Sequence, residues 1–237
     1  MFDPRQHLIV ALDVSSAAAA KEIVAALGDC AFTFKVGLQL YTAAGPQIVR
    51  DLVGTGHKVF LDLKYHDIPN TVAAAVREAA QLGVGMLTVH GAAGGKVLRA
   101  AVEAARKVNP DLLVLAVTVL TSMDDRDLEK VGVRGRVLDQ VLRLGALALS
   151  DGCDGLVTSA RETAELRSEL GGDFVIVNPG VRPVGSDHGD QARVVTPAEA
   201  IAAGASYIVV GRPITAAPDP AAAAKTILEQ MSLAVGV

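Results

Sequence analysis

The most reactive group of side chains in the sequence lies in the segment KVFLDLKYHDIPNT, residues 58–71. If this segment is a strand, alternate side chains point the same way, so Asp62, Lys64 and His66 share one face. Charges inside an apolar strand cost free energy unless they are paired. The Asp62–Lys64 pair is open to two interpretations, a structural salt bridge or a reactive site. A lysine beside carboxylates stays an ammonium, which suits a proton donor better than a nucleophile.

Two further charges favour the reactive site. Asp13 comes near the end of the apolar segment 8–14, and Lys35 near the end of 32–37. The carboxyl ends of parallel strands meet at one rim of a barrel, and catalytic residues lie there. Apolar residues could replace a purely structural ion pair at no cost in stability. Alternating charges converging on one rim therefore predict catalysis.

A second candidate site binds phosphate. Barrels often hold phosphate between the loops that follow strands seven and eight. The corresponding segments here are NPGVRPVGSDHGDQ and VVGRPI. Gly211 allows close backbone approach, Arg212 can bind an anion through two hydrogen bonds, and Gln191 can donate another. A solvated loop charge is the simpler interpretation of Gly211 and Arg212 alone, but their position after the last strand favours phosphate.

The elements that position these residues form an alternating series. Short segments rich in Val, Ile and Leu, typical of buried parallel strands, recur along the 237 residues at 8–14, 32–37, 58–65, 86–90, 112–120, 155–159, 174–180 and 207–211. Helical patterns separate most of them, at 15–28, 69–83, 94–108, 138–152, 160–171 and 219–231. A weaker helix over 38–56 is interrupted by Gly45 and Pro46.

This pattern predicts a single-domain (β/α)8 barrel, the TIM-barrel fold of the α/β class, over residues 1–237. A doubly wound open sheet is the rival, but it usually has fewer strands, and its GxGxxG fingerprint does not follow the first segment. The longest irregular segments, 121–136 and 181–196, are of a length that favours lids or binding loops.

Composition excludes several classes of function. The net charge is −4, and no basic stripe suggests nucleic acid. No apolar stretch reaches the roughly 18–20 residues of a membrane span, and the first residues do not resemble a signal peptide. Two cysteines make no disulfide framework. We expect a cytoplasmic protein that binds neither membrane nor nucleic acid.

Other chemical motifs are absent from the sequence. No two histidines have metal-ligand spacing, and no GxSxG motif occurs. The stretch GAAGGKVL, 91–98, lacks the first Gly and the Ser or Thr of a phosphate-binding P-loop. We expect no required metal and no organic cofactor. His90, at a strand end, could be a base, a ligand or a hydrogen-bonded structural residue.

The quoted motifs together resemble a known family. The set ALDV (11–14), FKVG (34–37), LDLKYHDIPNT (61–71), LTS (120–122), PGVRP (179–183) and VVGRPI (209–214) is similar to the bacterial branch of the orotidine 5′-monophosphate decarboxylases. The resemblance covers the whole chain, with the motifs in the same order. It implies cofactor-free decarboxylation of orotidine 5′-monophosphate to uridine 5′-monophosphate and CO2, the last step of UMP synthesis.

The resemblance also implies catalytic roles. Lys64 would deliver the proton to C6 of the pyrimidine, and Asp62 would lie against the substrate carboxylate. Lys35 and Asp67 would complete an alternating network. Asp67 and Thr71 would reach into the neighbouring subunit's site, which implies a homodimer.

Substrate-binding roles follow in the same way. Asp13 and Lys35 would hold ribose hydroxyls, and either Thr121 or Ser122 the pyrimidine edge. The 5′-phosphate would contact Gln191, Arg212 and the backbone at Gly211, with Arg182 at the base of a closing loop. The remaining residues expected to contact the substrate are Ile68 and Pro179.

Two alternatives stay open. Keto-gulonate-phosphate decarboxylases resemble the chain at the DxK core but use a divalent metal, so activity that a chelator leaves intact would argue against them. A non-catalytic barrel would bind a nucleotide monophosphate without releasing CO2. Such a binder has no need of a cationic lysine between carboxylates.

Overall fold

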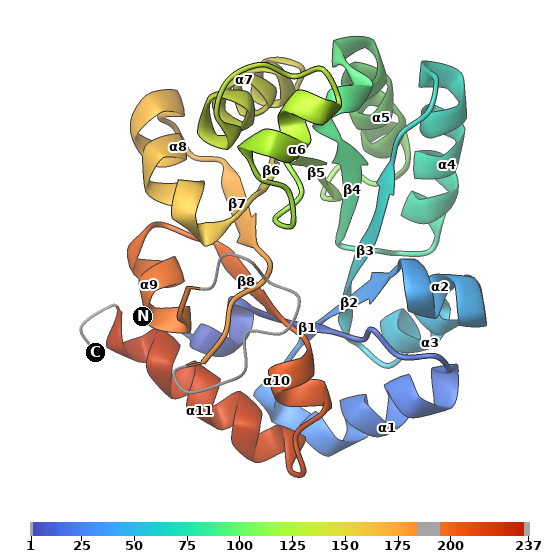
Figure 1. Cartoon of the computed structure of the whole chain (residues 1–237). Coiled ribbons are helices and arrows are strands. Elements are labelled where there is room, and N and C mark those ends of the chain that lie inside the picture. The colour runs from blue at the N-terminus through green and yellow to red at the C-terminus, as the bar shows by residue number, and fades with distance from the viewer. Residues whose placement is uncertain (1, 184–194, 235–237) are drawn as a thin grey trace.

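The described part of the chain forms a closed eight-stranded parallel barrel with helices around it (Figure 1). The computed structural model describes residues 2–183 and 195–234. The strands follow one another around the barrel in chain order. They are β1 Leu8–Ala11, β2 Thr33–Gly37, β3 Lys58–Tyr65, β4 Met86–His90, β5 Leu113–Val117, β6 Gly155–Val157, β7 Val175–Asn178 and β8 Tyr207–Val210. The predicted (β/α)8 barrel is confirmed.

The strands are apolar on both faces because each face is covered. Side chains that point inward fill the barrel, among them Ile9, Phe60 and Leu115. Side chains that point outward, such as Val10 and Leu87, pack beneath the helices in a larger cluster. Burial on both faces explains why the strands read as continuous apolar segments rather than as alternating ones.

The helices lie outside the barrel (Figure 1). They are α1 Ala17–Leu27, α2 Leu38–Ala44, α3 Gln47–Gly54, α4 Pro69–Gln81, α5 Gly95–Val108, α6 Asp125–Lys130, α7 Val137–Ser150, α8 Thr163–Leu170, α9 Pro197–Ala202, α10 Arg212–Thr215 and α11 Pro220–Leu233. Short 3-10 turns are η1 Pro4–Gln6, η2 Gly28–Cys30, η3 Gly91–Ala93 and η4 Ala160–Glu162. Of the helices in these described ranges, none is long and apolar enough to span a membrane.

Local sequence explains several helix boundaries. The Ser16 side chain accepts a hydrogen bond from the Ala19 N–H and caps α1. Pro69 begins α4, where its missing N–H has no helical partner to lose. The predicted break near Gly45 and Pro46 is confirmed, because Gly45 has a φ of 65° between α2 and α3.

The main differences from the prediction lie at strand ends and in short helices. β1 ends at Ala11 rather than at 14, and β5 ends at Val117 rather than at 120. Past β5, Val119 and Leu120 still line the cavity at the barrel mouth. Past β1, Leu12 and Val14 pack in the larger cluster beneath the helices. Within 121–136 the chain forms α6, which was not predicted, since a six-residue helix shows too little periodicity. α9 and α10 were missed for the same reason.

Candidate active site

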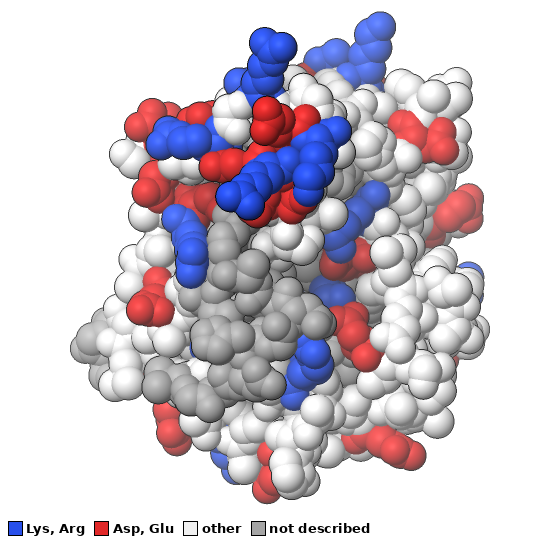
Figure 2. All heavy atoms as spheres, viewed as in Figure 1, with Lys and Arg blue, Asp and Glu red and all other residues white. Residues whose placement is uncertain are grey.

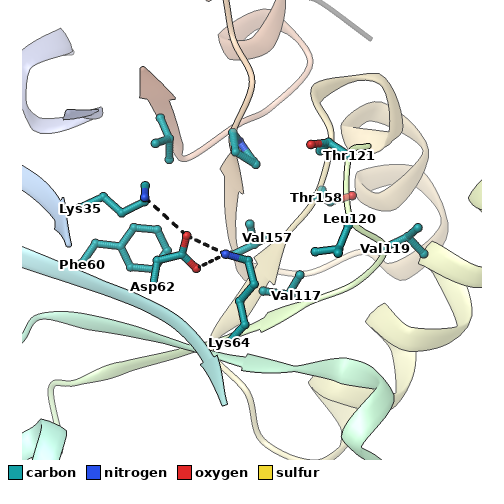
Figure 3. A pocket seen from close by; sticks show the side chains of 12 residues that line it. Lys35, Phe60, Asp62, Lys64, Val117, Val119, Leu120, Thr121, Val157 and Thr158 are labelled. Carbon is teal, nitrogen blue, oxygen red and sulfur yellow. Dashed lines mark hydrogen bonds and ion pairs between the residues drawn. The ribbon is translucent and has the colours of Figure 1, made fainter. Parts of the chain in front are cut away.

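Four charged side chains, from β2, β3 and the residues just after β1, meet at the carboxyl end of the barrel. Figure 3 shows three of them, Lys35, Asp62 and Lys64. The ammonium Nζ of Lys64 lies 2.9 Å from both carboxylate oxygens of Asp62. The Lys35 Nζ lies 2.9 Å from an oxygen of Asp13 and 3.8 Å from an oxygen of Asp62. Negative and positive groups therefore alternate along the cluster, and the structure brings together these four predicted residues.

The strand that carries Asp62 and Lys64 is not regular. Lys64 has a φ of 50°, and it is the one non-glycine residue with positive φ in the described part of the chain. The pairing of β3 with β4 shifts register between Leu61 and Tyr65. This irregularity turns the Lys64 side chain back toward Asp62. The alternation of side chains every two residues in a regular strand does not describe this geometry.

A buried threonine, which was not predicted, is hydrogen-bonded to the irregular segment. The Thr88 hydroxyl on β4 accepts a hydrogen bond from the Lys64 backbone N–H at 2.8 Å. The same hydroxyl donates to an Asp62 carboxylate oxygen at 3.0 Å. Thr88 is one polar residue in the apolar segment MLTVH, and nothing in that segment distinguishes it from a structural threonine.

An apolar cavity adjoins the ammonium of Lys64. Its lining, drawn in Figure 3, combines Lys35, Asp62 and Lys64 with less polar residues, namely Phe60, Val117, Val119, Leu120, Thr121, Val157, Thr158, Pro179 and Val209. The structure thus places Thr121 at the cavity, while Ser122 is not part of the lining. An apolar wall with few polar groups favours a flat organic ring with a defined orientation.

A second cavity continues from the first toward β8. The two share Lys35, Pro179 and Val209 in their walls. Arg182, Gly211 and Arg212 lie in the second cavity, as the phosphate hypothesis requires, and Arg182 is only 7% exposed. Gln39, at the start of α2, lines it too and was not predicted. Gln191 lies outside the described residues.

Three predicted residues lie away from the cluster within one chain. Asp67 is exposed, and its carboxylate accepts a hydrogen bond from the Ile68 N–H at 2.6 Å. Across the described ranges, Asp67 makes no ion pair with Lys64 or Lys35. Ile68 is 67% exposed, and Thr71 is also exposed at the start of α4. Within one chain, these three side chains are therefore exposed and take no part in the charged cluster.

His90, at the end of β4, is a neighbour of the charged cluster. Its ring stacks on that of His66, with ring centroids 5.4 Å apart, and its Nδ1 accepts from the Ala92 N–H. Burial lowers the pKa of His90, and the nearby His66 and Lys64 lower it further. The geometry favours a neutral, hydrogen-bonded histidine. Over the ranges that the structure describes, no three His, Cys, Asp or Glu side chains gather as metal ligands.

The face that contains the mouth carries charges of both signs. Figure 2 shows basic and acidic side chains interspersed over α6 and its surroundings, without a continuous basic patch. Ion pairs such as Lys130–Asp127 and Arg136–Asp139 account for part of this mixture. The described residues on this face form no broad cationic surface of the kind that nucleic acids require.

A family model described as orotidine 5'-phosphate decarboxylase / HUMPS family matches residues 6–227. The chain belongs to this family. An orotidine 5'-phosphate decarboxylase from Moorella thermoacetica is 52% identical over 235 residues, covering 97% of this chain and 93% of the relative. The one from Hydrogenovibrio crunogenus is 47% identical, covering 98% and 97%.

A solved structure agrees with these relatives. The crystal structure of orotidine 5'-phosphate decarboxylase from Lactobacillus acidophilus superposes with a TM-score of 0.85 at 38% sequence identity. The match covers 95% of this chain and 99% of that one. The resemblance seen in the sequence motifs is therefore confirmed at the level of the family and the fold.

Proposed function

We propose that the protein is a carbon–carbon lyase that decarboxylates orotidine 5′-monophosphate to uridine 5′-monophosphate and CO2 without a cofactor. The observation that carries this proposal is the contact of the Lys64 ammonium with both Asp62 carboxylate oxygens, at 2.9 Å, beside an apolar cavity. Relatives about half identical to this chain bear the name of that enzyme.

The chemistry needs a fixed cation. When the bond from C6 to the carboxylate breaks, CO2 departs and the electron pair stays on C6. A preorganised ammonium stabilises the developing carbanion. The folded protein already holds this ammonium in place, so no free energy is needed to orient it during the reaction. Lys64 then transfers a proton from Nζ to C6, forming the C–H bond of the product. The resulting neutral amine regains a proton from solvent.

Asp62 has two effects in this scheme. Its carboxylate holds the Lys64 ammonium through both oxygens. It also lies where the substrate carboxylate must sit, so repulsion between the two anions raises the energy of the bound substrate relative to the transition state. Lys35 lies between Asp13 and Asp62, and in the empty site its ammonium limits the repulsion between these two carboxylates.

The second cavity suits the rest of the nucleotide. Arg182, Arg212 and the backbone at Gly211 would hold the 5′-phosphate, with Gln191 as a further donor. Asp13 and Lys35 would bind the ribose hydroxyls, and Thr121, with Pro179 nearby, the pyrimidine. Binding energy from a phosphate remote from C6 can stabilise the geometry that the reacting carbon requires.

The active unit is proposed to be a cytoplasmic homodimer. Three residues beside the barrel mouth are exposed, namely Asp67, Ile68 and Thr71. In a dimer, these residues of one chain would reach into the site of the other chain. Their exposure supports this role, because a large apolar side chain such as Ile68 gains by burial against a partner.

One assay tests the proposal. Protein treated with a chelator is mixed with orotidine 5′-monophosphate, and the loss of the orotate absorbance is followed. Full activity with chelator is expected, whereas a metal-dependent relative on this barrel would lose its activity. Binding of the nucleotide without CO2 release would instead indicate a non-catalytic barrel and overturn the proposal.

Lys64→Ala then tests the mechanism. Turnover should fall roughly a thousandfold or more, because both charge stabilisation and the proton are lost. Lys58→Ala is the matched control, since Lys58 is an exposed lysine at the opposite end of the same strand. Circular dichroism checks that both variants fold. Near-normal turnover in folded Lys64→Ala would remove Lys64 from its role.

A further inference from the structure

We propose that Thr88 is a positioning residue for the reaction, one that sets the direction of the Lys64 ammonium through a single hydroxyl. The inference rests on the proposed function for its kinetic consequence. Its structural part rests on the geometry alone. No other described side chain is hydrogen-bonded to both the backbone of Lys64 and the carboxylate of Asp62.

The two hydrogen bonds of Thr88 define its orientation completely. A hydroxyl has one proton to donate and lone pairs to accept with. The proton is directed at Asp62 Oδ1, 3.0 Å away, and a lone pair receives the Lys64 N–H, 2.8 Å away. A β-branched side chain such as threonine has few χ1 rotamers, so the hydroxyl is held with little freedom.

The backbone of Lys64 needs such a constraint. A φ of 50° at a residue with a Cβ is unfavourable, and it persists only where the surroundings enforce it. The register shift between β3 and β4 leaves Lys64 outside the regular ladder pairs. Its N–H therefore bonds to the Thr88 side chain instead of to a strand carbonyl. Losing that bond would free Lys64 to return to an extended conformation.

An extended Lys64 would no longer direct its side chain at Asp62 in the same way. The present contact of Nζ with both carboxylate oxygens depends on the turn at this residue. Thr88 also fixes the other partner, since it donates to the same Asp62 oxygen that Lys64 contacts. The Thr88 hydroxyl thus positions both the backbone of Lys64 and the Asp62 carboxylate that contacts the Lys64 ammonium.

Burial makes the hydroxyl difficult to replace. Thr88 is fully buried, and it points inward from β4 at alternate positions with Met86 and His90. Valine has nearly the same shape but can neither accept from the Lys64 N–H nor donate to Asp62. Water has no free access to take over both bonds at a site with no exposed surface.

The experiment uses two pairs of residues that differ at the hydroxyl. Thr88→Val replaces the hydroxyl by a methyl group, and Thr88→Ser compared with Thr88→Ala repeats the test without the branch. Thr118→Val is the matched control, because Thr118 is also buried and its hydroxyl donates to the Val157 carbonyl, away from the cluster. For each variant we would measure kcat and KM with orotidine 5′-monophosphate, UMP affinity and thermal unfolding.

The proposal predicts that kcat follows the hydroxyl. In Thr88→Val and Thr88→Ala, kcat should fall roughly tenfold to a hundredfold, because a small misplacement of a catalytic group has effects of that size. KM and UMP affinity should change by less than about threefold, since the phosphate contacts are remote. Thr88→Ser should keep kcat close to that of the wild type, and Thr118→Val should do so as well.

Three outcomes would overturn the idea. Thr88→Val could retain wild-type kcat, Thr88→Ser could lose as much as Thr88→Ala, or Thr118→Val could match the loss in Thr88→Val. A crystal structure of Thr88→Val, or of Thr88→Ala if the valine variant does not fold, gives a readout that is independent of turnover. Lys64 should leave its positive φ there. If wild-type protein does not decarboxylate the nucleotide, the proposed function fails, and this structure still decides whether Thr88 fixes Lys64.

Discussion

Lys64 and Lys35 both approach Asp62, with Nζ to oxygen distances of 2.9 Å and 3.8 Å, and all three side chains are largely removed from solvent. Attraction between such groups is offset by the free energy needed to dehydrate them, so buried pairs add little net stability. An apolar barrel of this kind would fold as well with aliphatic residues there. The cluster is therefore best explained by the charges it presents to a ligand.

The pKa of His90 should be measurably lowered by the residues around its ring. Burial, followed by His66 and Lys64, lowers the pKa of His90 below 6.5. The ring should titrate below pH 6.5 in an NMR experiment on its imidazole protons. His66→Ala should raise that midpoint only in part, because burial remains. A midpoint at or above 6.5 in the wild type would contradict the packing described for this ring.

The same shift has a consequence for folding stability. In the unfolded chain His90 takes up a proton near pH 6.5, whereas the folded protein resists it. Below that pH the unfolded state binds more protons, so the contribution of neutral His90 to stability is lost as the pH falls. His90→Asn should therefore lose less stability than the wild type as the pH falls below 6.5. The free energy of unfolding, measured by chemical denaturation at several pH values from 6.5 downward, checks this.

At the scale of elements, the end of β2 determines the position of Lys35. A Cβ on Gly37 would lie 2.7 Å from Lys35 Nζ and 3.0 Å from Asp13 Oδ1. Gly37→Ala should therefore push apart this ion pair and lower kcat/KM for the nucleotide. Stability should change little, because the displaced atoms end flexible side chains and the φ of −100° at Gly37 is open to alanine.

Gly54→Ala is the control for that prediction. Apart from its chain neighbours and the backbone of its own helix α3, no heavy atom of the described residues lies within 4 Å of a Cβ at Gly54. Alanine is favoured over glycine in a helix by roughly 1 kcal/mol, so this variant should be at least as stable as the wild type and equally active. Equal kcat/KM in Gly37→Ala and Gly54→Ala would show that the Lys35–Asp13 contact has no part in substrate binding.

The sequence predicted the barrel and most of its charged mouth for identifiable reasons. Asp13 and Lys35 lie near the ends of apolar segments, and Arg182 and Arg212 follow such segments. Barrel closure brings every such end to one rim. Thr88 could not be predicted, because its role depends on a register shift between β3 and β4. Two-residue alternation placed Asp62 and Lys64 on one face but gave no indication of the positive φ at Lys64.

At the scale of the whole molecule, the mouth retains apolar groups that one chain does not cover. Leu38, Ile68 and Leu120 are 60%, 67% and 38% exposed, and each follows the carboxyl end of a strand. Exposed apolar residues gathered around a cavity mark an interaction surface. A two-fold dimer would cover the same surface on both subunits, and it would bring Asp67 of each chain toward the other's site.

Mixing two inactive variants tests whether sites are shared. In a dimer of Lys64→Ala with Asp67→Ala, one site would combine both defects, while the other would have an intact Lys64 from one chain and an intact Asp67 from its partner. Random re-pairing makes about half of the dimers mixed, so about a quarter of all sites should regain wild-type turnover. The recovered activity is measured by loss of the orotate absorbance, and distinct tags confirm subunit exchange.

The control mixture is Lys64→Ala with Asp62→Ala, whose defects lie in the same chain's cluster. Each mixed dimer then contains two damaged sites, and no recovery is expected. Because Asp67 makes no ion pair with the lysines among the described residues of one chain, recovery in the first mixture alone would locate its function in the partner's site. Verified exchange without recovery would mean that each barrel is complete by itself, and that the exposed Asp67 has no share in the chemistry.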